Sequence, residues 1–173
     1  MNPSIIDVLV VFDVDSILEK YPTPSKDPQN PTGLNGNDIG LIHMLVKQLR
    51  VMDGASGGEL RFSAKTNDII RWREETFSDN INSDVDVQLY GFLVTQGDGL
   101  IDKPQLKNVE VKKIIGNPTD PLSPTFQTIT DSFWQTTVLK PGDVTYHWRF
   151  MITDEKNDKL GYFEWDPFIH ITE

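Results

Sequence analysis

The strongest structural signal in the chain is the run Val144-Thr145-Tyr146-His147-Trp148-Arg149-Phe150-Met151-Ile152-Thr153. Its large apolar residues occupy every second position, and Thr, His, Arg and Met occupy the positions between them. Successive side chains of a β-strand point to opposite faces, so this period of two predicts a strand with one face against a core. On this interpretation Trp148 is a core residue.

Further strand-like runs flank this one, separated by clusters of Gly, Pro, Asn and Asp. They are predicted at residues 5–12, 42–51, 60–64, 70–73, 85–94, 109–115, 126–138 and 160–171. The runs 60–64 and 70–73 predict a hairpin around Thr66-Asn67-Asp68, and residues 154–159 predict a polar hairpin loop. Roughly eight or nine strands with short connections predict an all-β fold, an antiparallel β-sandwich of jelly-roll or immunoglobulin-like character.

One short helix is predicted near the N-terminus, from Ser16 to Tyr21, with Asp15 or Ser16 as its cap and Pro22 as its stop. The following stretch, Pro22 to Gly40, holds four prolines and three glycines and is predicted to be a loop. The composition does not change along the chain, so residues 1–173 are expected to form a single domain.

The bulk composition bounds the classes of partner. The net charge is -10 and the pI about 4.7, which disfavours nucleic acid and anionic membranes as partners. Cysteine is absent, which rules out disulfides, thiolate nucleophiles and zinc-thiolate sites and fits a reducing compartment. The start of the chain has no basic region, and no apolar run approaches the ~18 residues that span a bilayer. These features predict a soluble cytoplasmic protein.

Two acidic motifs suggest phosphatase chemistry. Asp13 and Asp15 follow the first predicted strand, and Asp98 and Asp102 occur much later, as in haloacid-dehalogenase-type phosphatases. That chemistry needs a nucleophilic carboxylate and a magnesium ion at the carboxyl ends of parallel strands, with crossover helices between the strands. The sequence between the motifs has hairpin spacing and no amphipathic segment of helical length. We therefore expect Asp13 and Asp15 to cap the short helix and Gly97-Asp98-Gly99 to form a turn.

Signals for metal or sugar binding are weak. The residues Asn67 to Trp72 and Pro141 to His147 have a cupredoxin-like strand rhythm, but blue copper requires a cysteine thiolate. The candidate ligands and sugar-stacking side chains are His43, His147, His170, Asn80, Asn82, Asp84, Trp72, Trp134, Trp148 and Trp165. The histidines have no ligand spacing, and the Asn80 to Asp84 stretch lacks the glycine and the final acid of a calcium loop. Alternation places Trp72 and Trp148 in the core but does not decide whether Trp134 and Trp165 are buried or exposed.

Several stretches together resemble the bacterial inclusion body protein family, of the AidA and PixA type. They are Ile5 to Val11 with Asp13, Tyr21-Pro22, Asn30-Pro31-Thr32, Asp68 to Arg73, Phe133-Trp134 and Gly161-Tyr162-Phe163-Glu164-Trp165-Asp166-Pro167. The resemblance implies an abundant stand-alone bacterial domain, in some cases collected in intracellular protein inclusions, with no established enzymatic activity. Members of the PixA type are rich in methionine, whereas this chain has 4 Met in 173 residues, which puts a methionine-specific role in doubt.

We therefore expect a non-catalytic protein that acts by self-association, as a homodimer or higher assembly, because a sandwich has open edge strands. No catalytic, cofactor-binding or metal-binding residues and no cofactor are predicted. The alternative is a β-sandwich binding module, with carbohydrate as one ligand class and the loop Pro22 to Gly40 as its recognition segment. A haloacid-dehalogenase-like phosphatase is the remote alternative.

Overall fold

The computed structural model describes residues 3–38, 40–54, 56–77 and 85–173. The helical segments within them are α1 (Val14–Lys20), η1 (Gly36–Asp38) and η2 (Gln48–Arg50). The strands are β1 (Ile5–Asp13), β2 (Thr32–Gly33), β3 (Ile42–Leu45), β4 (Val51–Asp53), β5 (Arg61–Lys65), β6 (Ile69–Phe77), β7 (Val85–Gln96), β8 (Gln105–Ile115), β9 (Thr125–Thr137), β10 (Gly142–Asp154), β11 (Lys159–Trp165) and β12 (Phe168–Thr172). Within the described ranges, none of the helices is long and apolar enough to cross a bilayer.

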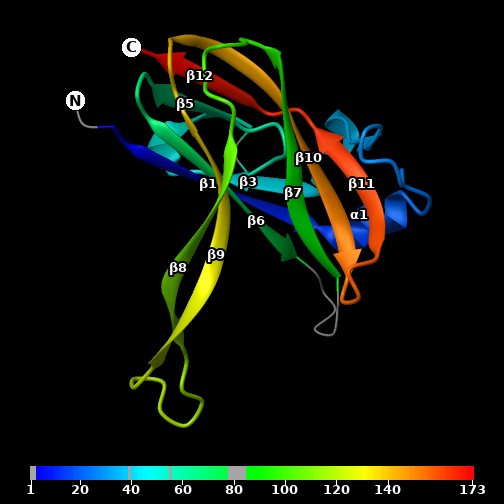
Figure 1. Ribbon diagram of the computed structural model, residues 1–173, viewed down its shortest axis with the longest axis vertical. Coiled ribbons are helices and arrows are strands. Elements are labelled where there is room, and N and C mark those ends of the chain that lie inside the picture. The colour runs from blue at the N-terminus through cyan, green and yellow to red at the C-terminus, as the bar shows by residue number, and fades with distance from the viewer. Residues whose placement is uncertain (1–2, 39, 55, 78–84) are drawn as a thin grey trace.

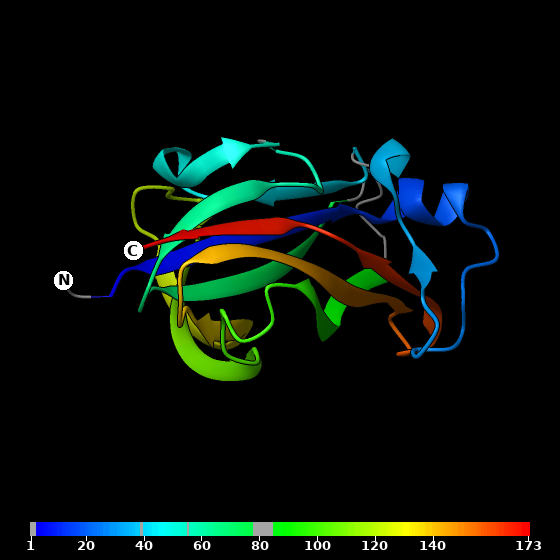
Figure 2. The same ribbon diagram turned by 90° about the horizontal axis from the view of Figure 1, so that it is seen from above.

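The strands form two sheets that pack together, which confirms the all-β sandwich. The five-stranded sheet has the order β3-β1-β6-β9-β8. The seven-stranded sheet has the order β2-β11-β10-β12-β5-β4, and β7 pairs with β10. Helix α1 lies at the end of the sandwich opposite the two termini, and the outer parts of β8 and β9 project from the body (Figure 1, Figure 2).

The core lies between the two sheets and is built from the alternating positions of the strands. Val144, Tyr146, Trp148, Phe150 and Ile152 of β10 are all buried, as the period of two predicts. They face Ile6, Val8, Val10 and Phe12 of β1 and other apolar residues of the same cluster. Aromatic rings join the layers: the Phe12 and Phe150 centroids are 4.4 Å apart and the Trp72 and Trp148 centroids 5.4 Å. Such tilted and edge-to-face pairs stabilise a core beyond their area burial.

The predicted hairpin of residues 60–64 and 70–73 is wrong. Strand β5 belongs to the seven-stranded sheet and β6 to the five-stranded sheet, so the chain crosses between the layers at Thr66-Asn67-Asp68. The buried Asp68 carboxylate fixes this crossing, because it accepts hydrogen bonds from the Ser4 and Lys65 backbone N–H groups at 3.0 Å each. It also pairs with Arg50 at 3.1 Å. The alternation of a strand is the same in a hairpin and in a crossing, so it could not separate the two.

Two predicted strands are each divided. Residues 42–51 form β3, η2 and the start of β4. Residues 160–171 form β11 and β12, interrupted at Asp166-Pro167, yet both pair with the same edge of β10 and keep one register, from Ile152 opposite Gly161 to Gly142 opposite Ile171. The predicted loop at 154–159 is confirmed as the connection of the antiparallel pair β10 and β11.

The sheets are also mixed rather than purely antiparallel. Strand β1 pairs parallel with β6, β2 with β11, and β5 with β12. Parallel pairs need long connections, and here each is made by a chain that leaves one sheet and returns through the other.

Candidate interaction surface

The first acidic motif lies at the start of α1. Asp13, rather than the expected Asp15 or Ser16, is the N-cap, and its Oδ1 accepts a hydrogen bond from the Ser16 backbone N–H at 3.1 Å. Asp15 lies in the first turn of the helix, where a negative charge interacts favourably with the helix dipole and stabilises the helix. The structure therefore supports the expectation that this motif builds a helix start.

The second acidic motif lies elsewhere. The Asp102 backbone N–H donates to the Thr137 carbonyl at 2.9 Å, and Thr137 pairs with Ile69 at the beginning of β6. Asp13, in contrast, pairs with Phe77 at the end of β6, eight residues away. Eight strand residues span roughly 26 Å, so these two acids cannot meet around one phosphoryl group. As expected, a turn forms at Gly97, whose carbonyl accepts from the Leu100 N–H at 3.2 Å.

The histidines are also dispersed. His43 lies on β3 with its Nδ1 3.0 Å from the Ser56 carbonyl, His147 lies on β10 with its Nδ1 3.8 Å from Glu164, and His170 lies on β12. His170 contacts Asp143 at 2.8 Å and lowers the pKa of that carboxyl, with a further contribution from Arg61. In the part of the chain that the structure describes, no group of three or more His, Asp or Glu side chains is placed to hold a metal ion. Asn80, Asn82 and Asp84 lie outside the described residues.

The tryptophans provide no exposed platform for a sugar. Trp72, Trp148 and Trp165 are buried. Trp134 is half-buried, packs edge-to-face on Trp148 at 5.4 Å, and donates its indole N–H to the Leu89 carbonyl at 3.1 Å. The predicted core positions of Trp72 and Trp148 are confirmed. Trp165 also lies in the core, and Trp134 packs against it.

The segment from Pro22 to Gly40, predicted as a loop, contains β2 and η1 and is tied to the body. Lys26 donates to the carbonyls of Lys159 and Leu160 at 2.9 and 2.8 Å. Asp38 is buried and forms an ion pair with Lys20, and it accepts hydrogen bonds from the Tyr21 hydroxyl at 2.8 Å and the Asn35 N–H at 2.9 Å. Burial alone would raise the pKa of Asp38, but these hydrogen bonds lower it. The carboxylate is a structural anchor for the loop.

The most unusual feature of the molecule is a projecting two-stranded ribbon. Strand β9 pairs with β6 only from Trp134 to Thr137, whereas it pairs with β8 from Gln135 to Thr125. Residues 107–133, here called the arm, therefore extend beyond the sheet, by roughly 25 Å of strand before the connecting loop (Figure 1). A two-stranded ribbon alone is marginally stable in water, so the arm offers a surface for further packing.

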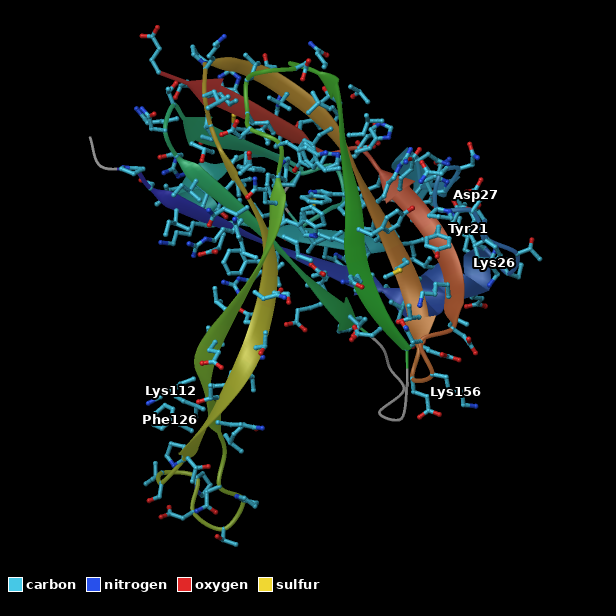
Figure 3. All side chains as sticks on the ribbon, in the orientation of Figure 1. Tyr21, Lys26, Asp27, Lys112, Phe126 and Lys156 are labelled. Carbon is cyan, nitrogen blue, oxygen red and sulfur yellow. The ribbon has the colours of Figure 1, made fainter. Side chains whose placement is uncertain are left out.

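Both faces of the arm expose apolar side chains. On one face, Ile114 and Phe126 are directly opposite each other and 64% and 66% exposed. Figure 3 shows Phe126 and Lys112 projecting to the same side of the ribbon, far from the body. The other face carries Val111 opposite Ile129, both half-buried, and the exposed Val109 and Ile115. At the base of that face, Phe133 is covered by the guanidinium groups of Arg71 and Arg73, at 4.7 and 4.8 Å.

The arm also carries a long open strand edge. Among the described strands, the edge strands β2, β3 and β4 are short, and short edges resist unwanted pairing. The long edge strand β7 is blocked for further pairing at Leu89, because the Leu89 N–H donates to Glu74 at 3.3 Å and its carbonyl accepts a hydrogen bond from the Trp134 indole N–H. Strand β8 ends the other sheet, and no described residue pairs with its outer edge. It is therefore an open edge on which another strand can form hydrogen bonds.

The charge of the arm differs from that of the body. The arm has three lysines, Lys107, Lys112 and Lys113, and three acids, Glu110, Asp120 and Asp131, so its formal charge is zero. The net charge of -10 belongs to the rest of the chain. Because like charges repel, contact between two copies is least opposed where the arms meet.

Sequence reasoning predicted both strands of the arm but not their projection. The composition of β9 is a partial signal, because nine of the 13 residues of Thr125–Thr137 are polar and such a strand has little to bury against a second sheet. The composition of β8 gives no such signal, because Gln105–Ile115 has about the same share of apolar residues as the core strand Gly142–Asp154.

Comparison with known proteins agrees with the fold and the resemblance. A crystal structure of an inclusion body protein of the PixA type from Burkholderia cenocepacia J2315 is similar over 99% of this chain and 98% of that chain, with a TM-score of 0.79 and 19% identity. A cysteine protease inhibitor, EhICP2, from Entamoeba histolytica aligns over 65% of this chain and 84% of that chain with 14% identity, and its TM-score of 0.27 supports no argument. No curated protein matches the chain.

The family comparison covers almost the whole molecule. The family model described as PixA, inclusion body protein, matches residues 4–171, which include both sheets and the complete arm. The chain belongs to the PixA family of inclusion body proteins.

Proposed function

We propose that this protein is a non-catalytic structural protein that acts by self-association inside the bacterial cell, with the arm as its contact surface. The observation that carries the proposal is the projecting arm, with its open β8 edge and its exposed apolar residues. Membership of an inclusion body protein family supports the same function. Exposed apolar side chains surrounded by polar residues are typical of a protein interaction surface.

The net charge predicts how this self-association depends on pH. At neutral pH the acidic bodies repel one another, and repulsion weakens as carboxylates are protonated toward the pI of about 4.7. Salt screens the same repulsion, with a Debye length of about 8 Å near physiological ionic strength. Assemblies should therefore grow as pH falls toward about 5 or as salt rises.

Sedimentation velocity and light scattering on the full chain test the proposal. From about pH 8 to about pH 5, and from low to about 0.5 M salt, we expect a dimer first and larger particles later. The double variant Ile114→Ser with Phe126→Ser should shift these transitions to higher protein concentration. Leu49→Ser, at a 78% exposed position on the body, is the matched control and should leave them in place. A wild-type chain that is monomeric under all these conditions contradicts the proposal.

A further inference from the structure

We infer that β8 pairs antiparallel with β8 of a second copy about a two-fold axis at Val111, so that two arms form one four-stranded ribbon of order β9-β8-β8-β9. This inference rests on the proposed function and names the strand, the partner and the register. A two-fold contact uses the same surface patch on both copies, so the residues of β8 must be complementary to themselves.

Geometry limits the registers to a few. In an antiparallel pair, residues opposite each other point to the same face of the sheet, so the axis must lie between the two β8 strands, midway between one residue and the same residue of the second copy. With the axis at Val111, Glu110 is opposite Lys112 of the second copy, and Lys112 is opposite its Glu110. Opposite charges across a strand pair contribute roughly 0.2–1 kcal/mol each, and like charges destabilise.

Neighbouring registers lack this match. With the axis at Glu110, that residue is opposite itself and Lys107 is opposite Lys113. With the axis at Lys112, that lysine is opposite itself. With the axis at Val109, Glu110 and Lys112 are opposite Asn108 and Leu106, and neither charge has a counterion.

The register that pairs Glu110 with Lys112 also brings apolar residues of the two copies together. Val111 is opposite Ile129 within each arm and opposite Val111 of the second copy across the axis. The four side chains thus form one continuous β-branched row across the ribbon. Such rows are the unit of sheet stabilisation, and the new ladder also satisfies the open N–H and C=O groups of β8.

The other long open edge in the arm has no such complementarity. The inner edge of β9 from Thr125 to Phe133 carries one charged residue, Asp131, which is paired with Arg73 of the same chain. On strand β7 the backbone N–H and carbonyl of Leu89 are already hydrogen-bonded to Glu74 and Trp134. Among the described strands, charge and access together therefore favour β8.

Cysteine cross-linking tests the register directly, because the chain has no cysteine of its own. In Val111→Cys, opposing Cα atoms of the two copies lie about 4.5–5.5 Å apart, which suits a disulfide. In the matched control Val109→Cys, on the same face, the two cysteines are four strand residues apart, roughly 13 Å. We expect a covalent dimer from Val111→Cys under mild oxidation and none from Val109→Cys. The reverse result overturns the register.

A charge exchange tests the same contact without oxidation. Glu110→Lys and Lys112→Glu should each raise the Kd of the dimer roughly tenfold, because two attractive pairs become repulsive. The double exchange restores both pairs and should restore the Kd. Circular dichroism checks that each variant is folded. A wild-type dimer that none of these changes affects overturns the inference and leaves self-association standing, whereas a wild-type chain that stays monomeric overturns both.

Discussion

The Glu74 carboxylate accepts a hydrogen bond from the Leu89 backbone N–H at 3.3 Å, which joins β6 of one sheet to the outer edge of β7 in the other. Its second oxygen, Oε2, is buried without a hydrogen-bond partner among the described residues. Burial raises the pKa of Glu74 to about 7, with further contributions from Asp86 and Glu75, although the Leu89 hydrogen bond acts in the opposite direction. The site lies just past Trp72, the last residue of β6 that pairs with β9 before the arm leaves the sheet.

This pKa makes the stability of the fold depend on pH. The folded state binds a proton at Glu74 more tightly than the unfolded state, where the pKa is near 4.5, so the stabilising contribution is complete below about pH 4.5 and is lost as pH rises through about 7. Glu74→Gln should raise the free energy of unfolding by about 1–3 kcal/mol at pH 8 and by much less near pH 4.5. Urea unfolding at both pH values measures this. Glu155→Gln, at an exposed position in the β10–β11 turn, is the control, and an effect of Glu74→Gln that is equal at both pH values would contradict the assignment.

Asp68→Ala should lower the free energy of unfolding by about 2–4 kcal/mol. The change removes the acceptor of the Ser4 and Lys65 N–H groups and leaves the half-buried Arg50 without its counterion. Urea unfolding compares it with Glu155→Ala in the exposed β10–β11 turn, which should change stability by less than about 0.5 kcal/mol. Equal effects of the two changes would show that Asp68 does not fix the crossing between the sheets.

Gly97 and Gly99 form a matched pair in the turn after β7, since both have positive φ, +84° and +76°. A Cβ at Gly97 would collide with the Asp143 carbonyl, whereas a Cβ at Gly99 meets nothing within 4 Å. Gly99→Ala should therefore cost about 1 kcal/mol from backbone strain alone. Gly97→Ala should cost about 3 kcal/mol or more, because the backbone must also move. Thermal unfolding of both variants checks the order, and a similar loss in each would remove the role of the close approach.

Asp13 gives a prediction that separates a helix cap from a nucleophile. Asp13→Asn keeps an acceptor for the Ser16 N–H and should be nearly neutral for stability, whereas Asp13→Ala should cost about 1 kcal/mol. We expect no magnesium-dependent release of phosphate from aryl phosphates by the wild-type chain or by either variant. Activity that the Asp13→Asn change abolishes would restore the phosphatase hypothesis.

The sequence predicted the faces of the strands better than their partners. Alternation placed Trp148 and its neighbours on β10 in the core, and it placed Trp72 there as well. It failed at Thr66-Asn67-Asp68, because two alternating strands joined by a short turn look alike whether they pair with each other or enter opposite sheets. The choice is made by the Asp68 carboxylate and its partners Ser4 and Arg50, which are distant in sequence.

The arm could be predicted only as a pair of strands. Val109, Val111 and Ile115 alternate with polar residues as they do in a half-buried strand. Whether such a strand is covered depends on a facing layer, and no described strand of the second sheet pairs along or covers the outer part of β8 and β9. The alternation of β8 contains no information about that layer.

Local chemistry by itself determined an all-β fold with one short α-helix among the described residues, the exclusion of thiolate chemistry and the strongly acidic charge, because alternation and composition are properties of neighbouring residues. Tertiary structure alone decided which strands cross between the layers, that Asp13 and Asp102 lie at opposite ends of β6, and that β8 is left with an open edge. The physical reason is that pairing and burial depend on residues brought together from distant parts of the chain, and a period of two is equally compatible with each arrangement.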